Sequence, residues 1–231
     1  MKLSIIIPCF NENKYIESVI DSVNAQPFND KQIIVVDDCS TDGTEIKLKK
    51  LKDLGKINNL ILHNFNQGKG AAIRSALKEV KGDIIIIQDA DLEYNPNDYS
   101  RLTKPISNGR ADAVYGSRFL GGGDDAHRVF FFWHRVANYI LTLFTNMLCD
   151  LSLTDMETGY KVFKRETLEN ITIEENRFGF EPEITVKLAK KKIRLFEVGI
   201  SYNGRTYQEG KKIGIKDAFR AFYCLVKYKF F

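Results

Sequence analysis

The sequence lacks several features that would place it in a specialised class of protein. It has 231 residues, with only 16 glycines, five prolines and four cysteines. These proportions exclude collagen-like and low-complexity chains, and a hydrophobic content of 44% excludes a disordered one. No run of about 20 apolar residues occurs, so we expect no membrane-spanning helix. A chain of this length buries roughly 70% of its unfolded surface, so one main domain needs no disulfide or metal to hold its core.

Several cysteine and glycine motifs are also missing. The four cysteines (Cys9, Cys39, Cys149 and Cys224) form no Cys-x-x-Cys or Cys-x-x-His pair, which argues against a zinc site. We interpret them as reduced thiols of a cytoplasmic protein. Residues 1–8 show no basic leader or cleavage site, so we expect a strand there rather than a signal peptide. The absence of Gly-x-Gly-x-x-Gly after this strand, and of Gly-x-x-x-x-Gly-Lys-Ser/Thr anywhere, argues against a dinucleotide-binding oxidoreductase and a P-loop protein.

The charge is small but unevenly distributed. A net charge of +4 does not indicate a nucleic-acid-binding protein, and we expect no nucleic-acid partner. Residues 1–185 contain 22 basic and 27 acidic side chains, whereas residues 186–231 contain 12 and 3. The sequence therefore predicts a mildly acidic body followed by a basic, aromatic-rich C-terminal segment.

Short apolar runs alternate with helical patterns along the first 90 residues. We predict strands at 3–8, 32–36, 60–63 and 83–87, and helices at 13–25, from 44 to about 54, and at 71–80. Continuous apolar strands are typical of a parallel sheet that is covered by helices on both faces. Further along, we predict strands at 112–115 and 193–200, and a short strand between them that ends at residue 163. We also predict helices at 128–148, 181–191 and 216–231.

Acidic residues follow three of the predicted strands. Glu12 follows the first, Asp37 and Asp38 the second, and Asp89 and Asp91 the fourth. Because ligands of such sheets bind beyond the carboxyl ends of the strands, this edge is the expected binding site.

The tripeptide Asp89-Ala90-Asp91 indicates a metal site. Two carboxylates on one turn supply hard oxygen ligands, which Mg²⁺ and Mn²⁺ prefer, and Glu93 would be a third. The alternative is structural, because Asp-x-Asp is common in turns. Asp37 and Asp38 would accept hydrogen bonds from a nucleobase or ribose, while Gly68 and Gly70 would let a nucleotide approach the backbone.

The ordered motifs resemble glycosyltransferase family 2, and within it the dolichyl-phosphate mannose synthases and related polyprenyl-phosphate sugar transferases. The segments that carry the resemblance are 7–12, 36–44, 66–70, 88–93, 116–118, 154–161, 178–181 and 202–207. The resemblance implies a GT-A fold, with a mainly parallel Rossmann-like sheet and helices on both faces. We assign residues 1–215 to this domain and residues 216–231 to an amphipathic C-terminal helix.

The resemblance also implies roles for individual residues. The nucleotide-sugar-binding set is Pro8, Phe10, Glu12, Asp37, Asp38, Gly68, Lys69, Asp89, Ala90 and Arg118. The metal set is Asp89, Asp91 and Glu93, where Glu93 stands at a position that is often Gln in the mannose synthases. The catalytic set is Asp91, Asp155, Glu181 and Arg205, and the acceptor phosphate would meet Arg118, Arg128, Arg205 and Lys211.

These implications predict a metal-dependent, inverting enzyme that moves mannose or glucose from a GDP- or UDP-sugar to a polyprenyl phosphate. The alternative acceptor is a sugar hydroxyl in surface polysaccharide or glycolipid synthesis, for which Asp155 or Glu181 would act as the base. The basic aromatic helix predicts peripheral binding at the cytoplasmic face of a membrane. A membrane-protein partner and a homo-oligomer stay open as alternatives.

Overall fold

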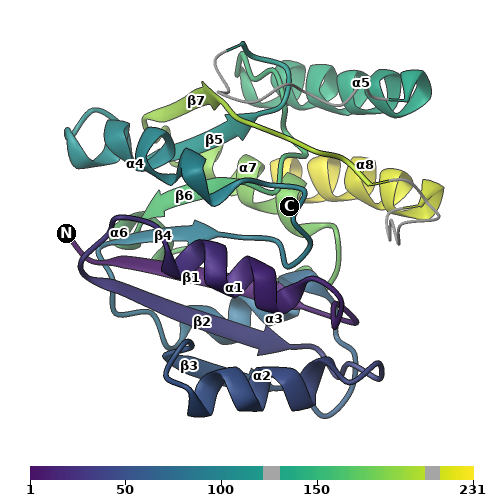
Figure 1. Ribbon diagram of the computed structural model, residues 1–231. Helices are drawn as coiled ribbons and strands as arrows, with labels where there is room; N and C mark the ends of the chain where they lie inside the picture. The colour runs from purple at the N-terminus through teal and green to yellow at the C-terminus, as the bar shows by residue number, and fades with distance from the viewer. Residues whose placement is uncertain (122–130, 206–213) are drawn as a thin grey trace.

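The computed structural model describes residues 1–121, 131–205 and 214–231. It contains one seven-stranded sheet in the order β3-β2-β1-β4-β6-β5-β7 (Figure 1). The strands are β1 (Leu3–Cys9), β2 (Lys31–Asp37), β3 (Asn59–Leu62), β4 (Ile84–Ile87), β5 (Ala113–Ser117), β6 (Lys161–Lys164) and β7 (Leu195–Gly199). All neighbouring strands pair in parallel except β6, which runs antiparallel to both β4 and β5. The predicted mixed α/β architecture with a mainly parallel sheet is confirmed.

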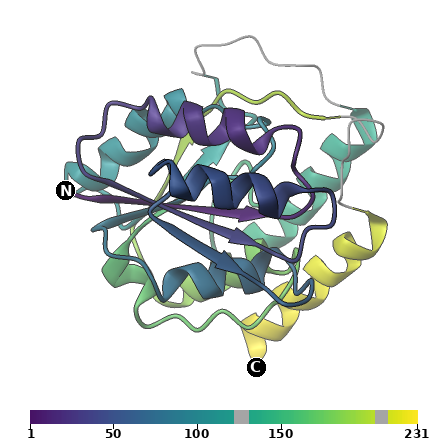
Figure 2. The same cartoon turned by 60° about the horizontal axis from the view of Figure 1, so that its bottom comes forward.

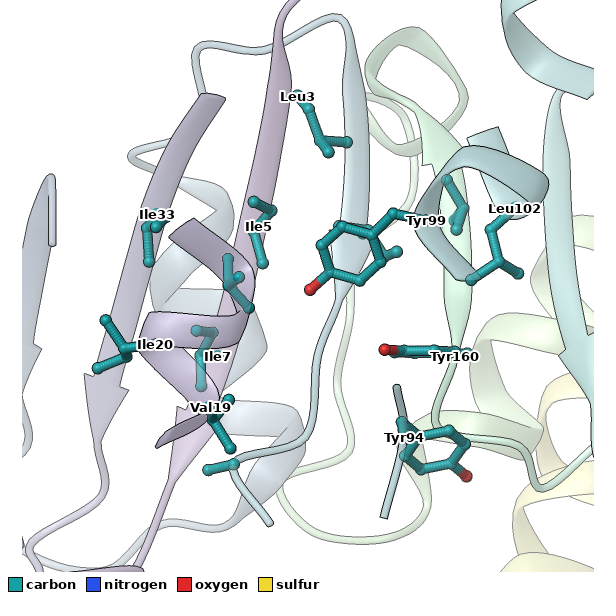
Figure 3. Packing of buried hydrophobic residues seen from close by; sticks show 14 of the residues in the cluster. Leu3, Ile5, Ile7, Val19, Ile20, Ile33, Tyr94, Tyr99, Leu102 and Tyr160 are labelled. Carbon is teal, nitrogen blue, oxygen red and sulfur yellow. The ribbon is translucent and has the colours of Figure 1, made fainter. Parts of the chain in front are cut away.

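Helices cover both faces of the sheet, because side chains of successive strand residues point to opposite faces. Leu3, Ile5 and Ile7 pack in one cluster with α1 (Ile16–Asn24), α2 (Thr44–Asp53) and α4 (Tyr99–Ser107). Figure 3 shows part of this cluster, including the tyrosines that follow β4. Ile6 packs in the other cluster with α3 (Lys69–Leu77), α5 (Phe132–Cys149), α7 (Phe180–Lys190) and α8 (Ile215–Phe230). The two helical layers lie on either side of the sheet in Figure 2.

Most predicted elements occur within a few residues of their expected bounds. Three short elements were not predicted: the 3₁₀ turn η1 (Pro96–Asp98), helix α4 and helix α6 (Arg165–Leu168). Helix α4 contains Pro105 in its last turn, and a proline inside a helical pattern normally indicates that the helix has ended. Here the sheet-facing side chains Tyr99, Leu102 and Ile106 are almost fully buried, so packing outweighs the weak local pattern.

Helix α8 lies on the body of the protein through one face and leaves the other exposed. Ala221, Cys224, Leu225 and Tyr228 are buried, and the rings of Phe222 and Phe144 of α5 lie 5.3 Å apart. None of the helices in the described part of the chain combines the length and apolar character needed to cross a bilayer.

Candidate active site

The carboxyl ends of β1, β2 and β4 bring the predicted acidic residues to one edge of the sheet. Their shared parallel register explains this, because Ile7 pairs with Val35 and Ile6 with Ile87. Glu12 and Asp38 are almost completely buried, at 5% and 3% exposure. The sequence therefore correctly predicts that the three strands deliver their carboxylates to a common place.

Arg205 joins the acidic groups of this edge. Its guanidinium contacts Asp91 Oδ2 at 2.5 Å and Glu12 Oε2 at 3.2 Å, and its backbone N–H donates to Glu93 Oε1 at 2.7 Å. Burial opposes the guanidinium charge, but the three carboxylates outweigh it and hold the pKa of Arg205 above its usual value. The structure thus brings the predicted catalytic residues Asp91 and Arg205 into direct contact.

The turn after β4 allows this convergence. Leu92 has a φ of 50°, the left-handed region that leucine rarely adopts. Asp91 and Glu93, on either side of it, both reach the same guanidinium. Glu93 also accepts a hydrogen bond from the Tyr202 hydroxyl at 2.8 Å, so both of its carboxylate oxygens have partners.

The edge carries more negative charge than Arg205 neutralises. Burial, together with the carboxylates of Glu93 and Asp89, raises the pKa of Asp91 to about 7 against the opposing effect of Arg205. A further cation beside Asp91 would relieve this repulsion.

Lys69, the first residue of α3, connects β4 with α7. Its Nζ lies 2.8 Å from Asp89 Oδ1 and 2.9 Å from Glu181 Oε1. Burial alone would lower the pKa of Lys69, but the two carboxylates raise it well above the usual value, so the side chain stays charged. The other oxygen of Glu181, Oε2, is buried without a partner.

Asp37 and Asp38 make internal hydrogen bonds in this structure. Asp38 accepts from the backbone N–H groups of Gln67 and Gly68 at 2.9 and 2.6 Å, and lies 2.7 Å from His63 Nδ1. Asp37 accepts from the backbone and hydroxyl of Ser40. Burial raises the pKa of Asp37, an effect that Ser40 partly offsets. The contacts of Asp38 hold the loop 66–70, which contains Gly68 and Gly70, in place. Direct binding of a nucleotide by either aspartate stays a prediction.

Gly68 and Gly70 are needed for close packing. Gly68 has a φ of +102°, and a Cβ there would lie 2.4 Å from the carbonyl oxygen of Asn176. A Cβ on Gly70 would lie 2.1 Å from the carbonyl oxygen of Glu175. The glycines therefore bring the start of α3 against the backbone of the segment 175–177, and the approach of a nucleotide to this loop stays a prediction.

Arg118 and Asp155 form a two-pronged ion pair on the other side of the site. Arg118 Nε and Nη2 each lie 2.7 Å from a different oxygen of Asp155, which is fully buried. Burial opposes the charge of Arg118, but Asp155 outweighs it and raises the pKa of the guanidinium. Since both carboxylate oxygens are engaged, this geometry suits the orientation of Arg118 better than proton removal. A catalytic role for Asp155 stays a prediction.

The remaining predicted residues are placed as follows. Pro8, Phe10 and Ala90 lie at the same edge, in β1, just after it and just after β4. Arg128 and Lys211, predicted to contact the acceptor phosphate, lie outside the described residues.

Sequence reasoning missed two charged residues, the half-buried Glu157 and the buried Lys161. Lys161 is fully buried and donates to the carbonyl oxygens of Met156 and Thr158 at 2.8 and 2.6 Å. Burial raises the pKa of Glu157, as does Glu181, against the influence of Lys161 and Arg118. Both residues fall within the motif 154–161, so that motif was the available signal.

The carboxylate oxygens of Asp89 and Asp91 are hard ligands of the kind that divalent cations prefer. The excess negative charge at this edge would also favour the binding of such a cation. Within residues 1–121, 131–205 and 214–231, however, no three His, Cys, Asp or Glu side chains are grouped closely enough to hold an ion. Mg²⁺ is usually bound by one or two carboxylates, with phosphate and water oxygens completing its shell. Asp89 and Asp91 fit that pattern, and Glu93 as a third ligand stays a prediction.

Comparisons with known proteins place this geometry in a family. The model of the Glycosyl transferase family 2 matches residues 4–172. A dolichol-phosphate mannosyltransferase from Pyrococcus furiosus is 28% identical, over 99% of this chain and 65% of that protein. A UDP-N-acetylglucosamine--dolichyl-phosphate N-acetylglucosaminyltransferase from Methanococcus voltae is 29% identical, over 97% of this chain and 95% of that protein. The present chain thus spans just under two thirds of the Pyrococcus relative and nearly all of the Methanococcus one.

The fold of this chain resembles that of solved glycosyltransferase structures. Glucosyl-3-phosphoglycerate synthase from Mycobacterium tuberculosis, in complex with Mn²⁺, UDP and phosphoglyceric acid, has a TM-score of 0.72 at 20% identity. The match covers 99% of this chain and 78% of that one. The same enzyme with Mg²⁺ and UDP has a TM-score of 0.67 at 21% identity, covering 98% and 79%. The family model matches most of the chain, and the fold matches these solved structures. The chain therefore belongs to glycosyl transferase family 2 and is a glycosyltransferase with a GT-A fold.

Proposed function

We propose that the protein transfers a hexose, mannose or glucose, from a nucleotide sugar to a polyprenyl phosphate with inversion. The observation that carries this proposal is the meeting of Asp89 and Asp91 with Lys69 and Arg205 at the carboxyl edge of the sheet. The named relatives from Pyrococcus furiosus and Methanococcus voltae support a dolichyl-phosphate acceptor. An undecaprenyl-phosphate mannosyltransferase from Micrococcus luteus, 27% identical over 93% of this chain and 88% of that protein, supports the same acceptor class.

The donor site on this proposal is built around Asp89 and Asp91. They would hold Mg²⁺ or Mn²⁺, and such an ion, when bound, neutralises the charge that develops on the leaving diphosphate. Lys69 and Arg205 fix the two carboxylates in place. Arg205 also holds Glu12, which the family resemblance assigns to the nucleoside.

The acceptor side of the site does not need a strong base. A phosphate monoester has a second pKa of about 6, so its oxygen is already anionic at neutral pH and attacks the anomeric carbon directly. Arg118 and Arg205 are the described residues that would attract it, and Asp155 holds the guanidinium of Arg118 in a fixed orientation. Arg128 and Lys211 are proposed to assist.

Exposed apolar side chains on α5 and α8 support binding at a membrane surface. On α8, Phe219 and Phe230 are 72% and 65% exposed, and on α5, Trp133 is 75% exposed. The two helices pack against each other, so their outward side chains would enter the headgroup region together. Flotation of the purified chain with neutral and with anionic vesicles tests this. Binding to neither kind would refute the membrane proposal and leave the transfer reaction to be judged separately.

The function itself is tested by a donor screen. The full chain is incubated with a short polyprenyl phosphate, Mg²⁺ or Mn²⁺, and GDP-mannose, UDP-glucose or UDP-N-acetylglucosamine in turn. We expect a lipid product whose mass rises by one sugar for one donor. EDTA and the variant Asp91→Asn should each abolish it. Failure of all three donors to modify the lipid would refute the proposal, and full turnover in EDTA would refute its metal dependence.

A hydroxyl acceptor is the second candidate, and Glu181 favours it. Its Oε2 is buried without a hydrogen-bond partner. A general base needs such an uncommitted oxygen to accept the proton of a substrate hydroxyl. The variant Glu181→Gln distinguishes the two cases. It should abolish transfer to a hydroxyl but leave most of the transfer to an anionic phosphate.

A further inference from the structure

A surface cavity of about 530 Å³ lies where the ends of α5, α7 and α8 meet the start of β7. Its volume is within the range of ligand sites in proteins, and several of its lining residues are exposed, so a solute can enter it. Glu181 at the start of α7 contacts Lys69, whereas Lys190 at the end of α7 lines the cavity. About 14 Å of helix therefore separates the cavity from the catalytic edge.

Three lysines line this cavity without a carboxylate partner. Lys190, Lys192 and Lys229 form no ion pair with any residue that the structure describes. Asp150 is the one acidic residue among the described lining residues, so positive charge is in excess. By contrast, three nearby basic residues that do not line the cavity are each paired: Lys187 with Glu183 at 2.6 Å, Arg194 with Asp112 at 2.7 Å and Lys227 with Glu174 at 3.4 Å.

The lysines converge on the cavity from different elements. Burial raises the pKa of the Cys149 thiol, which also lines the cavity, and the ammonium groups of Lys229 and Lys190 oppose this rise. Two lysines, one from α8 and one from α7, thus act on the same point at the end of α5. An anion at that point would be attracted by both.

Lys192 stands at a backbone position that glycine usually takes. It follows the end of α7, its N–H donates to the carbonyl oxygen of Ala189 at 2.9 Å, and its φ is 52°. Helices commonly end on glycine in this left-handed conformation, because other side chains are strained there. A lysine that breaks this local rule and lines a cavity indicates a use for its side chain.

Apolar groups form the rest of the lining and the surface beside it. Met147 in the last turn of α5 and Phe230 at the end of α8 are 74% and 65% exposed. Lysines next to exposed apolar side chains are typical of a surface that meets lipid headgroups. The apolar residues that line the cavity itself are Leu151, Val186, Ala189, Ile193 and Leu195.

We propose that this cavity binds the anionic headgroup of a membrane phospholipid and so fixes the ends of α5 and α8 on the membrane surface. The inference rests on the membrane binding proposed above and is independent of the transfer reaction. General attraction between a basic protein and an anionic membrane depends on the number of charges. A headgroup site depends instead on which lysines line the cavity.

Lys191 provides a matched control for this difference. It lies between Lys190 and Lys192 and is exposed as they are, but it does not line the cavity. Lys190→Gln should lower the partition coefficient onto vesicles of phosphatidylcholine and phosphatidylglycerol about fivefold, the value of about 1 kcal/mol for one basic residue at an anionic surface. Lys191→Gln should lower it less than twofold. The fluorescence of Trp133, the single tryptophan, follows binding during a vesicle titration.

Two further substitutions separate binding from stability. Lys192→Gly removes the ammonium group and relieves the left-handed backbone. The melting temperature should therefore stay unchanged or rise, while the partition coefficient onto anionic vesicles falls about fivefold. Asp150→Asn removes the negative charge of the lining, and asparagine tolerates its φ of 55°. This variant should bind anionic vesicles more tightly than the wild type.

The inference is overturned if Lys190→Gln and Lys191→Gln weaken anionic-vesicle binding equally, or if the wild type binds phosphatidylcholine vesicles as tightly as anionic ones. It is also overturned if inorganic phosphate binds as tightly as the vesicles and Lys190→Gln removes that binding, because the site would then take a soluble anion. Turnover of a short polyprenyl phosphate without vesicles should be unchanged in all four variants. A wild type that binds anionic vesicles but transfers no sugar refutes only the proposed reaction, whereas a wild type that binds no vesicle refutes the membrane proposal and this inference together.

Discussion

The substitution Gly70→Ala sets two physical effects against each other. Gly70 lies in the first turn of α3, and by helix propensity alone alanine would stabilise this position by at most about 0.5–1 kcal/mol. The added methyl group, however, would lie 2.1 Å from the carbonyl oxygen of Glu175, 3.1 Å from its carbonyl carbon and 3.3 Å from the carbonyl oxygen of Arg177. These are backbone atoms, which cannot rotate away as the end of a side chain would.

The structure therefore predicts that the clash outweighs the gain in propensity. Overpacking of a well-packed region costs about 1–3 kcal/mol, so a net loss of about 1–2 kcal/mol is expected. For a chain of this size each kcal/mol lowers the melting temperature by about 2–4 °C, which gives a fall of about 2–8 °C. Because Lys69 is the neighbouring residue, the displacement of α3 should also reduce turnover.

Thermal unfolding followed by circular dichroism, together with a urea titration, measures the effect. Gly109→Ala is the control, because a Cβ there meets nothing within 4 Å and the cost comes only from a φ of +69°. The control should lose about 1 kcal/mol and keep full turnover. A melting temperature of Gly70→Ala equal to or above that of the wild type would refute the reasoning, since it would show that the 175–177 backbone yields freely.

Three further substitutions test the charged pairs. Lys69→Met leaves the carboxylates of Asp89 and Glu181 without their cation. Loss of one partner of a buried ion pair should lower the free energy of unfolding, measured by urea titration, by about 3–5 kcal/mol. An unchanged free energy of unfolding would contradict the pairing. Asp155→Asn weakens charge-assisted hydrogen bonds of about 1.5–3 kcal/mol, so kcat/KM should fall about 10- to 100-fold and the melting temperature by about 3–12 °C; full activity would show that the orientation of Arg118 is unimportant. Hydrogen bonds from Arg194 hold the pKa of Asp112 well below its usual range, so this pair stabilises the fold above about pH 4 and loses its effect as the pH falls further. Asp112→Asn should therefore lower the urea midpoint slightly at pH 7 and by less near pH 2, and an equal loss at both pH values would contradict the assignment.

The strands and the edge at which their carboxylates meet could be predicted because they depend on local patterns. A run such as Ile84–Ile87 indicates a buried strand by itself, and parallel pairing with β1 then brings the residues that follow it to the same edge as Glu12. The partners of those carboxylates could not be predicted. Arg205 reaches Asp91 across 114 residues of sequence, and the antiparallel direction of β6 follows from packing rather than from any local signal. The roles of Gly68 and Gly70 also depend on a distant segment, since the backbone they approach begins about 100 residues later.

Besides its apolar packing, α8 has two polar contacts that converge on one acidic residue of the body. Arg220 and Tyr228 both bond to Glu175, and Glu175 is the residue against which Gly70 packs.

The reversed direction of β6 has a consequence for how this site can diversify. In a wholly parallel sheet, only segments that leave a strand reach the binding edge. Because β6 enters the sheet from that edge, the segment 154–160 arrives there before its strand begins. There it packs on the loop that follows β4, since the backbone N–H of Gly159 donates to the Tyr94 hydroxyl at 2.8 Å and a Cβ on Gly159 would lie 2.3 Å from Asp89 Oδ2. A change in this incoming segment would therefore act directly on the carboxylates that leave β4, so the two parts of the edge must vary together.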